Sequence, residues 1–161
     1  MRIGVVSDTH DNLPNVARIA AIFRAAGIER VIHTGDITRP ETLLALGGAG
    51  VPIVGVYGNN DRDRAGLAAA AASIGAQILE PPLELVWAER RIAVVHDRSR
   101  HAESLARSHH VTLFGHEHRL TLAREPERLV FNPGECAGLL EGRNAIGVVD
   151  LASLEAELLR F

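Results

Sequence analysis

Short apolar segments alternate with helical segments along residues 3–74. Each apolar segment is typical of a buried strand, and the segment after it has helical spacing or high helix propensity. This alternation predicts parallel strands in an α/β fold, because a helix returns the chain to the same end of the sheet after each strand. The expected strands are 3–6, 30–33 and 52–57, and the expected helices are 13–26, 41–46 and 64–74.

The second half of the chain is mostly β. Its apolar segments are short and separated by turns, and one helix is expected over residues 99–108. We therefore expect a second sheet with more antiparallel pairing than the first. The expected strands are 78–79, 83–87, 91–95, 111–114, 119–124, 128–131, 145–151 and 155–160.

Size and composition are those of a globular domain. The chain has 161 residues, of which 47% are hydrophobic and 23% are charged. We expect one domain over residues 1–161, and the composition excludes a disordered chain. Cys136 is the single cysteine, which excludes an intrachain disulfide and a cysteine-based zinc site.

Charge and hydropathy argue against two classes of partner. All 17 basic residues are arginine, and 20 acidic residues bring the formal net charge to −3. Nucleic acid is therefore not the expected partner, although a local basic patch stays open. No apolar run approaches the ~20 residues of a membrane span, and there is no signal-peptide pattern. We expect a cytoplasmic protein with no membrane partner, and a homo-oligomer stays open.

Five apolar segments end in clusters of residues that can bind metals. In open α/β sheets, ligand sites lie outside the carboxyl ends of the strands. Clusters that are distant in the sequence can therefore converge on one edge of the fold. The five clusters are Asp8-Thr9-His10, Gly35-Asp36, Gly58-Asn59-Asn60-Asp61, His96-Asp97 and Gly115-His116-Glu117-His118.

The residue types in these clusters fit a centre of two metal ions. Aspartate and histidine bind divalent transition metals through oxygen and nitrogen. Asp8 and His10 are two residues apart, so both can face one side of an extended segment, and His116 and His118 repeat this spacing. Asp36 lies in a glycine turn, where its carboxylate could bridge two ions. The candidate metal ligands are Asp8, His10, Asp36, Asn59, His96, His116 and His118.

The order of these motifs resembles the calcineurin-like metallophosphoesterase superfamily. Asp-x-His, Gly-Asp, Gly-Asn-x-Asp, His and Gly-His-x-His follow one another between Ile3 and about Leu151. Segments 7–11, 58–61 and 132–136 are similar to the small prokaryotic phosphodiesterase branch. The resemblance implies a four-layer α/β/β/α sandwich of two mixed sheets, with the site at the strand ends.

The resemblance also implies an arrangement of the site and a reaction. One ion would be held by Asp8, His10, Asp36 and His118, and the other by Asp36, Asn59, His96 and His116. A hydroxide bridging the two ions would hydrolyse a small phosphodiester or an activated phosphate ester. The ligand set admits Mn²⁺, Fe, Zn²⁺, Ni²⁺ or Co²⁺, and we favour Mn²⁺. The expected catalytic residues are Asp36, Asn59, His96 and Asp61, with Asp61 orienting a ligating histidine.

Two positions depart from the family pattern. Many members have a histidine after the metal-binding asparagine, where this chain has Asn60, which cannot act as an acid. The branch usually shows His-Gly-His, where this chain has His96-Asp97-Arg98. The first departure favours substrates with good leaving groups, or another residue as the acid. His33 and Glu135 are expected to be structural rather than ligands.

Two other functions stay open. Some relatives use this fold as a protein-binding scaffold with little catalysis, and such a chain is free to lose metal ligands. A nuclease would use the same chemistry, but the net charge of −3 and the lack of basic runs argue against tight binding of a polymer.

Overall fold

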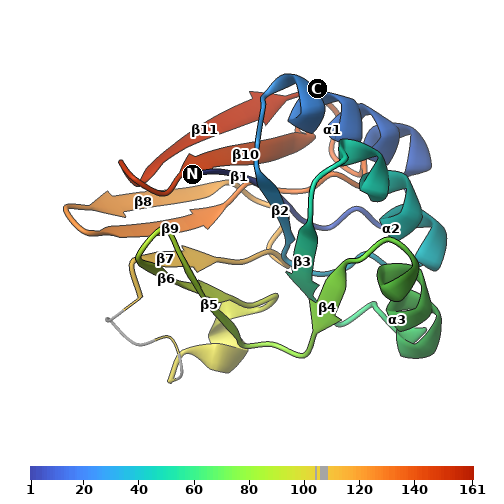
Figure 1. Cartoon of the computed structure of the whole chain (residues 1–161), viewed down its shortest axis with the longest axis horizontal. Coiled ribbons are helices and arrows are strands. Elements are labelled where there is room, and N and C mark those ends of the chain that lie inside the picture. The colour runs from blue at the N-terminus through green and yellow to red at the C-terminus, as the bar shows by residue number, and fades with distance from the viewer. Residues whose placement is uncertain (104, 106–108) are drawn as a thin grey trace.

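Two β-sheets lie face to face, with three helices covering the outer face of one of them (Figure 1). The computed structural model spans residues 1–161 and describes all of them except 104 and 106–108. Sheet A has the order β11-β10-β1-β2-β3-β4 and sheet B the order β5-β6-β7-β9-β8. Sheet A contains β1 (Arg2–Val6), β2 (Arg30–His33), β3 (Ile53–Val56), β4 (Gln77–Leu79), β10 (Ala145–Asp150) and β11 (Glu155–Arg160). Sheet B contains β5 (Leu83–Trp87), β6 (Arg90–Val94), β7 (Val111–Leu113), β8 (Thr121–Glu125) and β9 (Arg128–Asn132).

The helices bury their apolar sides against sheet A. They are α1 (Leu13–Ala25), α2 (Pro40–Leu46) and α3 (Arg64–Ser73), and the 3-10 helix η1 (Gly47–Ala49) follows α2. In α1, Val16, Ile19 and Phe23 are buried at helical spacing and pack in one core with Val6 and Val31 of sheet A. Within the described residues, no helix has the length and apolar character needed to cross a bilayer.

A second core lies between the two sheets. Ile3, Val5 and Ile32 of sheet A share it with Leu113 and Phe131 of sheet B. Of the expected helix over residues 99–108, the described residues show only the 3-10 helix η2 (Arg98–His101), and residues 104 and 106–108 lie outside the described residues. The α/β fold with two mixed sheets is therefore the one that the resemblance implied. Of its four layers, the described residues show three, since all three α-helices pack on sheet A.

The pairing of the last two strands differs from the prediction. We expected the β-rich half to form the second sheet, but β10 pairs antiparallel with β1, and β11 pairs antiparallel with β10. The reason is burial on both faces. Ile146 and Val148 of β10 lie in the helix-side core, and Val149 lies in the core between the sheets. Sheet B is also less antiparallel than expected, since β6, β7 and β9 run parallel.

Strand polarity brings the chemistry-bearing loops to one edge. In sheet A, β1, β2 and β3 are parallel neighbours, so the residues after each strand emerge side by side. The loops are joined by backbone hydrogen bonds from Asp8 N to the carbonyl of Gly35 (3.1 Å) and from Gly115 N to the carbonyl of His96 (3.0 Å). We call this edge, at the carboxyl ends of β1, β2, β3, β6 and β7, the carboxyl edge.

The close approach of the sheets depends on Gly147, and Gly147→Ala tests it. A Cβ atom there would overlap the ring of Phe131, so we expect the free energy of unfolding to fall by about 1–3 kcal/mol. Denaturant unfolding measures this change. Gly48→Ala is the matched control, since a Cβ there meets only an ordinary contact at 3.6 Å. Equal stability of the two variants would contradict the tight packing at Gly147.

Candidate metal centre

Five of the seven candidate ligands have a left-handed backbone. The φ angles are 51° at Asp8, 39° at His10, 59° at Asp36, 70° at His116 and 52° at His118. Residues with a side chain rarely adopt this conformation, which costs roughly 1–2 kcal/mol each. Such strain gathers where the surrounding structure holds functional groups in place. The loops at the carboxyl edge are therefore locally strained, and the strained backbone orients these five side chains.

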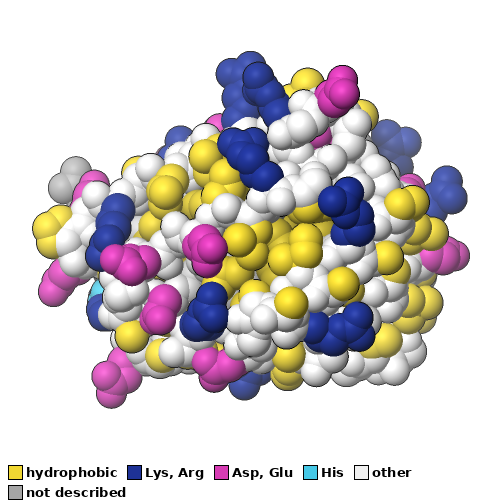
Figure 2. Space-filling view, turned by 90° about the horizontal axis from the view of Figure 1, so that it is seen from above, with side chains coloured by type: hydrophobic (Ala, Val, Ile, Leu, Met, Phe, Trp, Pro, Cys, Tyr) yellow, Lys and Arg dark blue, Asp and Glu magenta, His cyan; other side chains and the backbone are white. Residues whose placement is uncertain are grey.

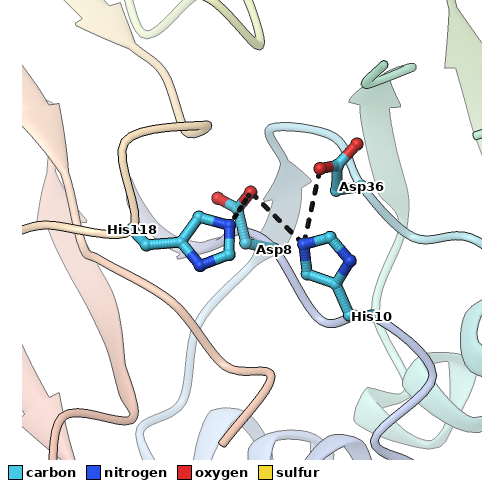
Figure 3. A group of neighbouring side chains, drawn as sticks. All are labelled: Asp8, His10, Asp36 and His118. Atoms are coloured by element: carbon cyan, nitrogen blue, oxygen red, sulfur yellow. Dashed lines mark ion pairs between the residues drawn. The ribbon is translucent and has the colours of Figure 1, made fainter. Parts of the chain in front are cut away.

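The first group of candidate ligands comes from the ends of three strands. Asp8 and His10 follow β1, Asp36 follows β2 and His118 follows β7, and their ligand atoms all lie within 4.8 Å of one another. Asp8 Oδ1 is 3.2 Å from His118 Nε2, and His10 Nε2 is 3.4 Å from Asp36 Oδ2 (Figure 3).

Two buried atoms of this group show that a cation fits it. Asp8 Oδ1 and His10 Nε2 are buried without a hydrogen-bond partner, an arrangement that is costly unless something else satisfies them. The other carboxylate oxygen of Asp8 accepts hydrogen bonds from the Ser7 hydroxyl and from His116 N. The carboxylate is thus fixed with one oxygen left for a ligand.

The second group shares Asp36 with the first. His96 Nε2 is 3.0 Å from Asn59 Oδ1 and 3.5 Å from Asp36 Oδ2. The His96 Nδ1–H donates to the carbonyl of Thr34 at 2.9 Å, which leaves Nε2 facing the other ligands. His116 lies beside this group, with its ring centre 5.1 Å from that of His96, but its Nε2 atom is 3.7 Å from Asp97 Oδ2. Within the described residues, the ligand atoms that lie within 4.8 Å of one another are those of the first group, so the structure does not bring His116 to Asp36 as closely as the resemblance implied.

The charges of these residues are coupled. Burial opposes ionisation of Asp36, but hydrogen bonds and charge from His96, with donors of Asn60, hold the pKa of its carboxyl well below the usual range. The carboxylate of Asp8, 3.2 Å from His118 Nε2, raises the pKa of His118. Burial lowers the pKa of His96, but the hydrogen bond and charge of Asp36 more than offset it and raise that pKa. Protons on these histidines therefore compete with a metal ion for the same nitrogens.

Asp61 differs from the prediction in its contacts. We expected it to orient a ligating histidine. Its carboxylate instead accepts backbone hydrogen bonds from Asp36 N (3.0 Å), Thr38 N (2.6 Å) and Gly58 N (2.6 Å). No hydrogen bond joins Asp61 to a histidine in the part of the chain that the structure describes. Asp61 therefore links the loop of Asp36 to the loop of Gly58, because its carboxylate accepts hydrogen bonds from the backbone of both.

Asn60 contacts the shared carboxylate, which the sequence did not predict. Its backbone N and side-chain Nδ2 donate to the two oxygens of Asp36 at 2.9 and 2.8 Å. The one sequence signal for this contact is that Asn60 directly follows the candidate ligand Asn59. Gly58 lies equally close, since a Cβ there would overlap Asp36 Oδ1. The Gly-Asn-Asn turn is therefore shaped around Asp36.

The residues expected to be structural are buried supports of the loops. His33 contacts Thr9 Oγ1 at 3.1 Å and accepts from Gly35 N at 3.1 Å. Glu135 accepts from the backbone of the following loop at Leu140 N (2.9 Å). Cys136 is fully buried, and burial raises the pKa of its thiol, so it is not a nucleophile.

Similar proteins are found by sequence and by structure. The family model of the calcineurin-like phosphoesterase superfamily domain matches residues 1–154. A phosphodiesterase of Methanocaldococcus jannaschii is 31% identical over 159 residues, which cover 96% of each chain. The solved structure of an archaeal phosphodiesterase superposes with a TM-score of 0.91 and 30% identity over 100% of both chains. The phosphoesterase Yfce from E. coli shares the fold, with a TM-score of 0.72 and 20% identity over 99% of this chain and 98% of that one.

Acid should destabilise the protein through His33. Burial lowers its pKa from 6.5 to about 4, so the folded state binds fewer protons than the unfolded state between these pH values. The contribution of neutral His33 to the free energy of unfolding is fully present above pH 6.5. This contribution falls by about 3 kcal/mol as the pH falls toward 4. We expect chelator-treated His33→Gln to lose less stability over this range than the parent, by urea unfolding at several pH values. Parallel pH profiles of the two proteins would contradict the assignment.

Proposed function

The chain belongs to the calcineurin-like phosphoesterase superfamily, and we propose that it hydrolyses phosphodiesters or activated phosphate esters at a centre of two divalent metal ions. One observation carries the proposal of two ions rather than one. Asp36 Oδ2 lies 3.4 Å from His10 Nε2 and 3.5 Å from His96 Nε2, at the junction of the two ligand groups. Asp8 and His118 complete one group, and the other contains Asn59 and His116.

The ligand set suits borderline divalent metals. Nitrogen and oxygen donors admit Mn²⁺, Fe, Zn²⁺, Ni²⁺ and Co²⁺, and availability decides among them as much as affinity. We propose Mn²⁺ as the assay metal. When bound, two such ions activate a water molecule and neutralise the phosphoryl oxygens of the ester.

The residues of the chain hold this chemistry in place. Asp36 keeps its negative charge, because the Asn60 donors and the neighbouring imidazoles stabilise it. His116 lies at the accessible side of the centre, with 41% of its side chain exposed, so substrate can approach there. Asn60 carries no acidic proton, and Asp61 is engaged by three backbone N–H groups. Leaving groups that need no protonation should therefore react fastest.

Hydrolysis of bis-p-nitrophenyl phosphate tests the activity. Protein stripped with chelator should be inactive, and added Mn²⁺ should restore turnover. The double variant Asp36→Asn, His116→Ala should lose at least about 100-fold in kcat/KM, since it removes the shared ligand and one further ligand. Arg24→Gln on α1 is the control and should keep the parental rate. Metal binding without turnover across the five metals would instead favour a protein-binding scaffold.

The number of ions is tested separately from activity. Elemental analysis after equilibration with Mn²⁺ should give two ions per chain for the parent. His10→Ala and His116→Ala should each give one, because each variant removes a ligand from a different group. A single ion in the parent, lost in His10→Ala and retained in His116→Ala, would rule out the binuclear centre.

A further inference from the structure

A cleft of about 390 Å³ adjoins the metal-ligand group at His118. Arg119, Arg143 and Arg160 line it together with His118, and no acidic residue is among its described lining residues. Guanidinium groups bind phosphate through paired, planar hydrogen bonds. The cleft thus has the chemistry of an anion site next to the candidate centre.

The three arginines converge through the topology of the fold. Arg119 follows His118 in the connection from β7 to β8, Arg143 precedes β10, and Arg160 is the last residue of β11. Because β10 runs antiparallel to both β1 and β11, the end of β11 lies at the same edge of sheet A as the end of β1. The arginines therefore come from three separate segments to the carboxyl edge.

Acidic side chains of the described residues do not pair with these three arginines. None of the three guanidinium groups forms an ion pair with a residue that the structure describes, whereas Arg39 pairs with Asp11 at 3.1 Å and Arg124 with Glu155 at 3.2 Å. The acids nearest in sequence are Glu117, Glu141 and Glu157, and none of them forms an ion pair with these arginines in the described part of the chain; Glu157 lies 4.0 Å from Arg2 instead. Glu135, next to the lining residue Gly134, is buried, and its carboxylate accepts from backbone N–H groups of the next loop. Three unpaired cations at one cleft repel one another, and a bound anion would offset this repulsion.

The pocket on the His96 side of the centre differs in charge from the arginine cleft. On the face drawn in Figure 2, arginine and acidic side chains are interspersed around a central apolar group. The pocket of about 160 Å³ on the His96 side of the centre contains the ion pairs Arg64–Glu80 (3.4 Å) and Arg100–Asp97 (3.3 Å). The two sides of the centre thus differ in the charge that they offer to a substrate.

We propose that this arginine cleft binds a second phosphate group of the substrate while the scissile phosphodiester lies at the metal centre, an inference that rests on the proposed function. The preferred substrate is then a small phosphodiester with a further phosphate, such as a dinucleotide phosphorylated at one end. Figure 3 shows His118 and Asp36 on opposite sides of Asp8, so the second phosphate lies on the His118 side. The net charge of −3 favours such a short ligand over a long polyanion.

The test compares thymidine dinucleotides with and without a terminal phosphate, at the 5′ or the 3′ end, in the presence of Mn²⁺. For the parent, kcat/KM should be at least about tenfold higher for one phosphorylated form than for TpT, since charge-assisted hydrogen bonds supply this much. The variant Arg119→Gln, Arg143→Gln, Arg160→Gln should lose that preference and keep the parental rate on TpT. Arg24→Gln should keep the preference. Equal kcat/KM of the parent for all three dinucleotides would overturn the inference and leave the proposed function standing.

A binding measurement separates this inference from the proposed function. If no dinucleotide is hydrolysed, the proposed function fails on this substrate class, and calorimetry still tests the cleft. The full chain in chelator should bind the preferred phosphorylated dinucleotide at least about tenfold more tightly than the triple variant does. Equal affinities would overturn the cleft assignment. All three arginines are exposed, so their substitution should leave the fold intact.

Discussion

The buried carboxylate of Asp36 is the interaction on which the carboxyl edge is built. Burying a charge is costly unless partners surround it, and nearby loops supply them. Asn60 donates to both oxygens, and His10 and His96 face the same Oδ2 atom. Asp61 fixes the backbone N–H of Asp36 itself. These contacts keep the carboxylate charged and aimed between the two ligand groups.

The strands and the cores supply the rigidity that this arrangement needs. Left-handed backbone at five ligand positions costs free energy that the loops do not recover locally. Two hydrophobic cores, one on each side of sheet A, hold the ends of β1, β2 and β3 in place. Gly147 lets Phe131 of sheet B approach sheet A closely, and sheet B carries the loop with His116 and His118. Packing far from the centre therefore sets the distances within it.

The charges on the two sides of the centre favour one orientation of the proposed substrate. Matched ion pairs surround the pocket beside His96, whereas the cleft beside His118 presents arginines without acidic partners. A neutral ester group suits the first side and an anionic group the second. Such a local patch is compatible with the net charge of −3, because no acidic residue is among the described lining residues of the cleft.

Much of the fold and of the candidate site could be predicted from the sequence because those signals are local. Apolar runs define the strands, and Asp8, Asp36 and His96 each follow one directly. Helical spacing placed α1, and high helix propensity placed α3, each to within a residue or two. The residues implied as ligands are brought together by strand polarity, which short crossover connections enforce.

Contacts between distant segments were decided by the tertiary structure alone. The sequence does not show that β10 inserts beside β1, since an apolar strand can be buried in either sheet. It does not show that Asp61 bonds backbone N–H groups or that Asn60 bonds Asp36, since both depend on side-chain direction. Arg119, Arg143 and Arg160 look like ordinary surface residues along the chain, and only strand pairing brings them to one cleft. The sequence by itself determined which residue types follow each strand, and the tertiary structure decided which of them meet, because local propensity carries no information about long-range pairing.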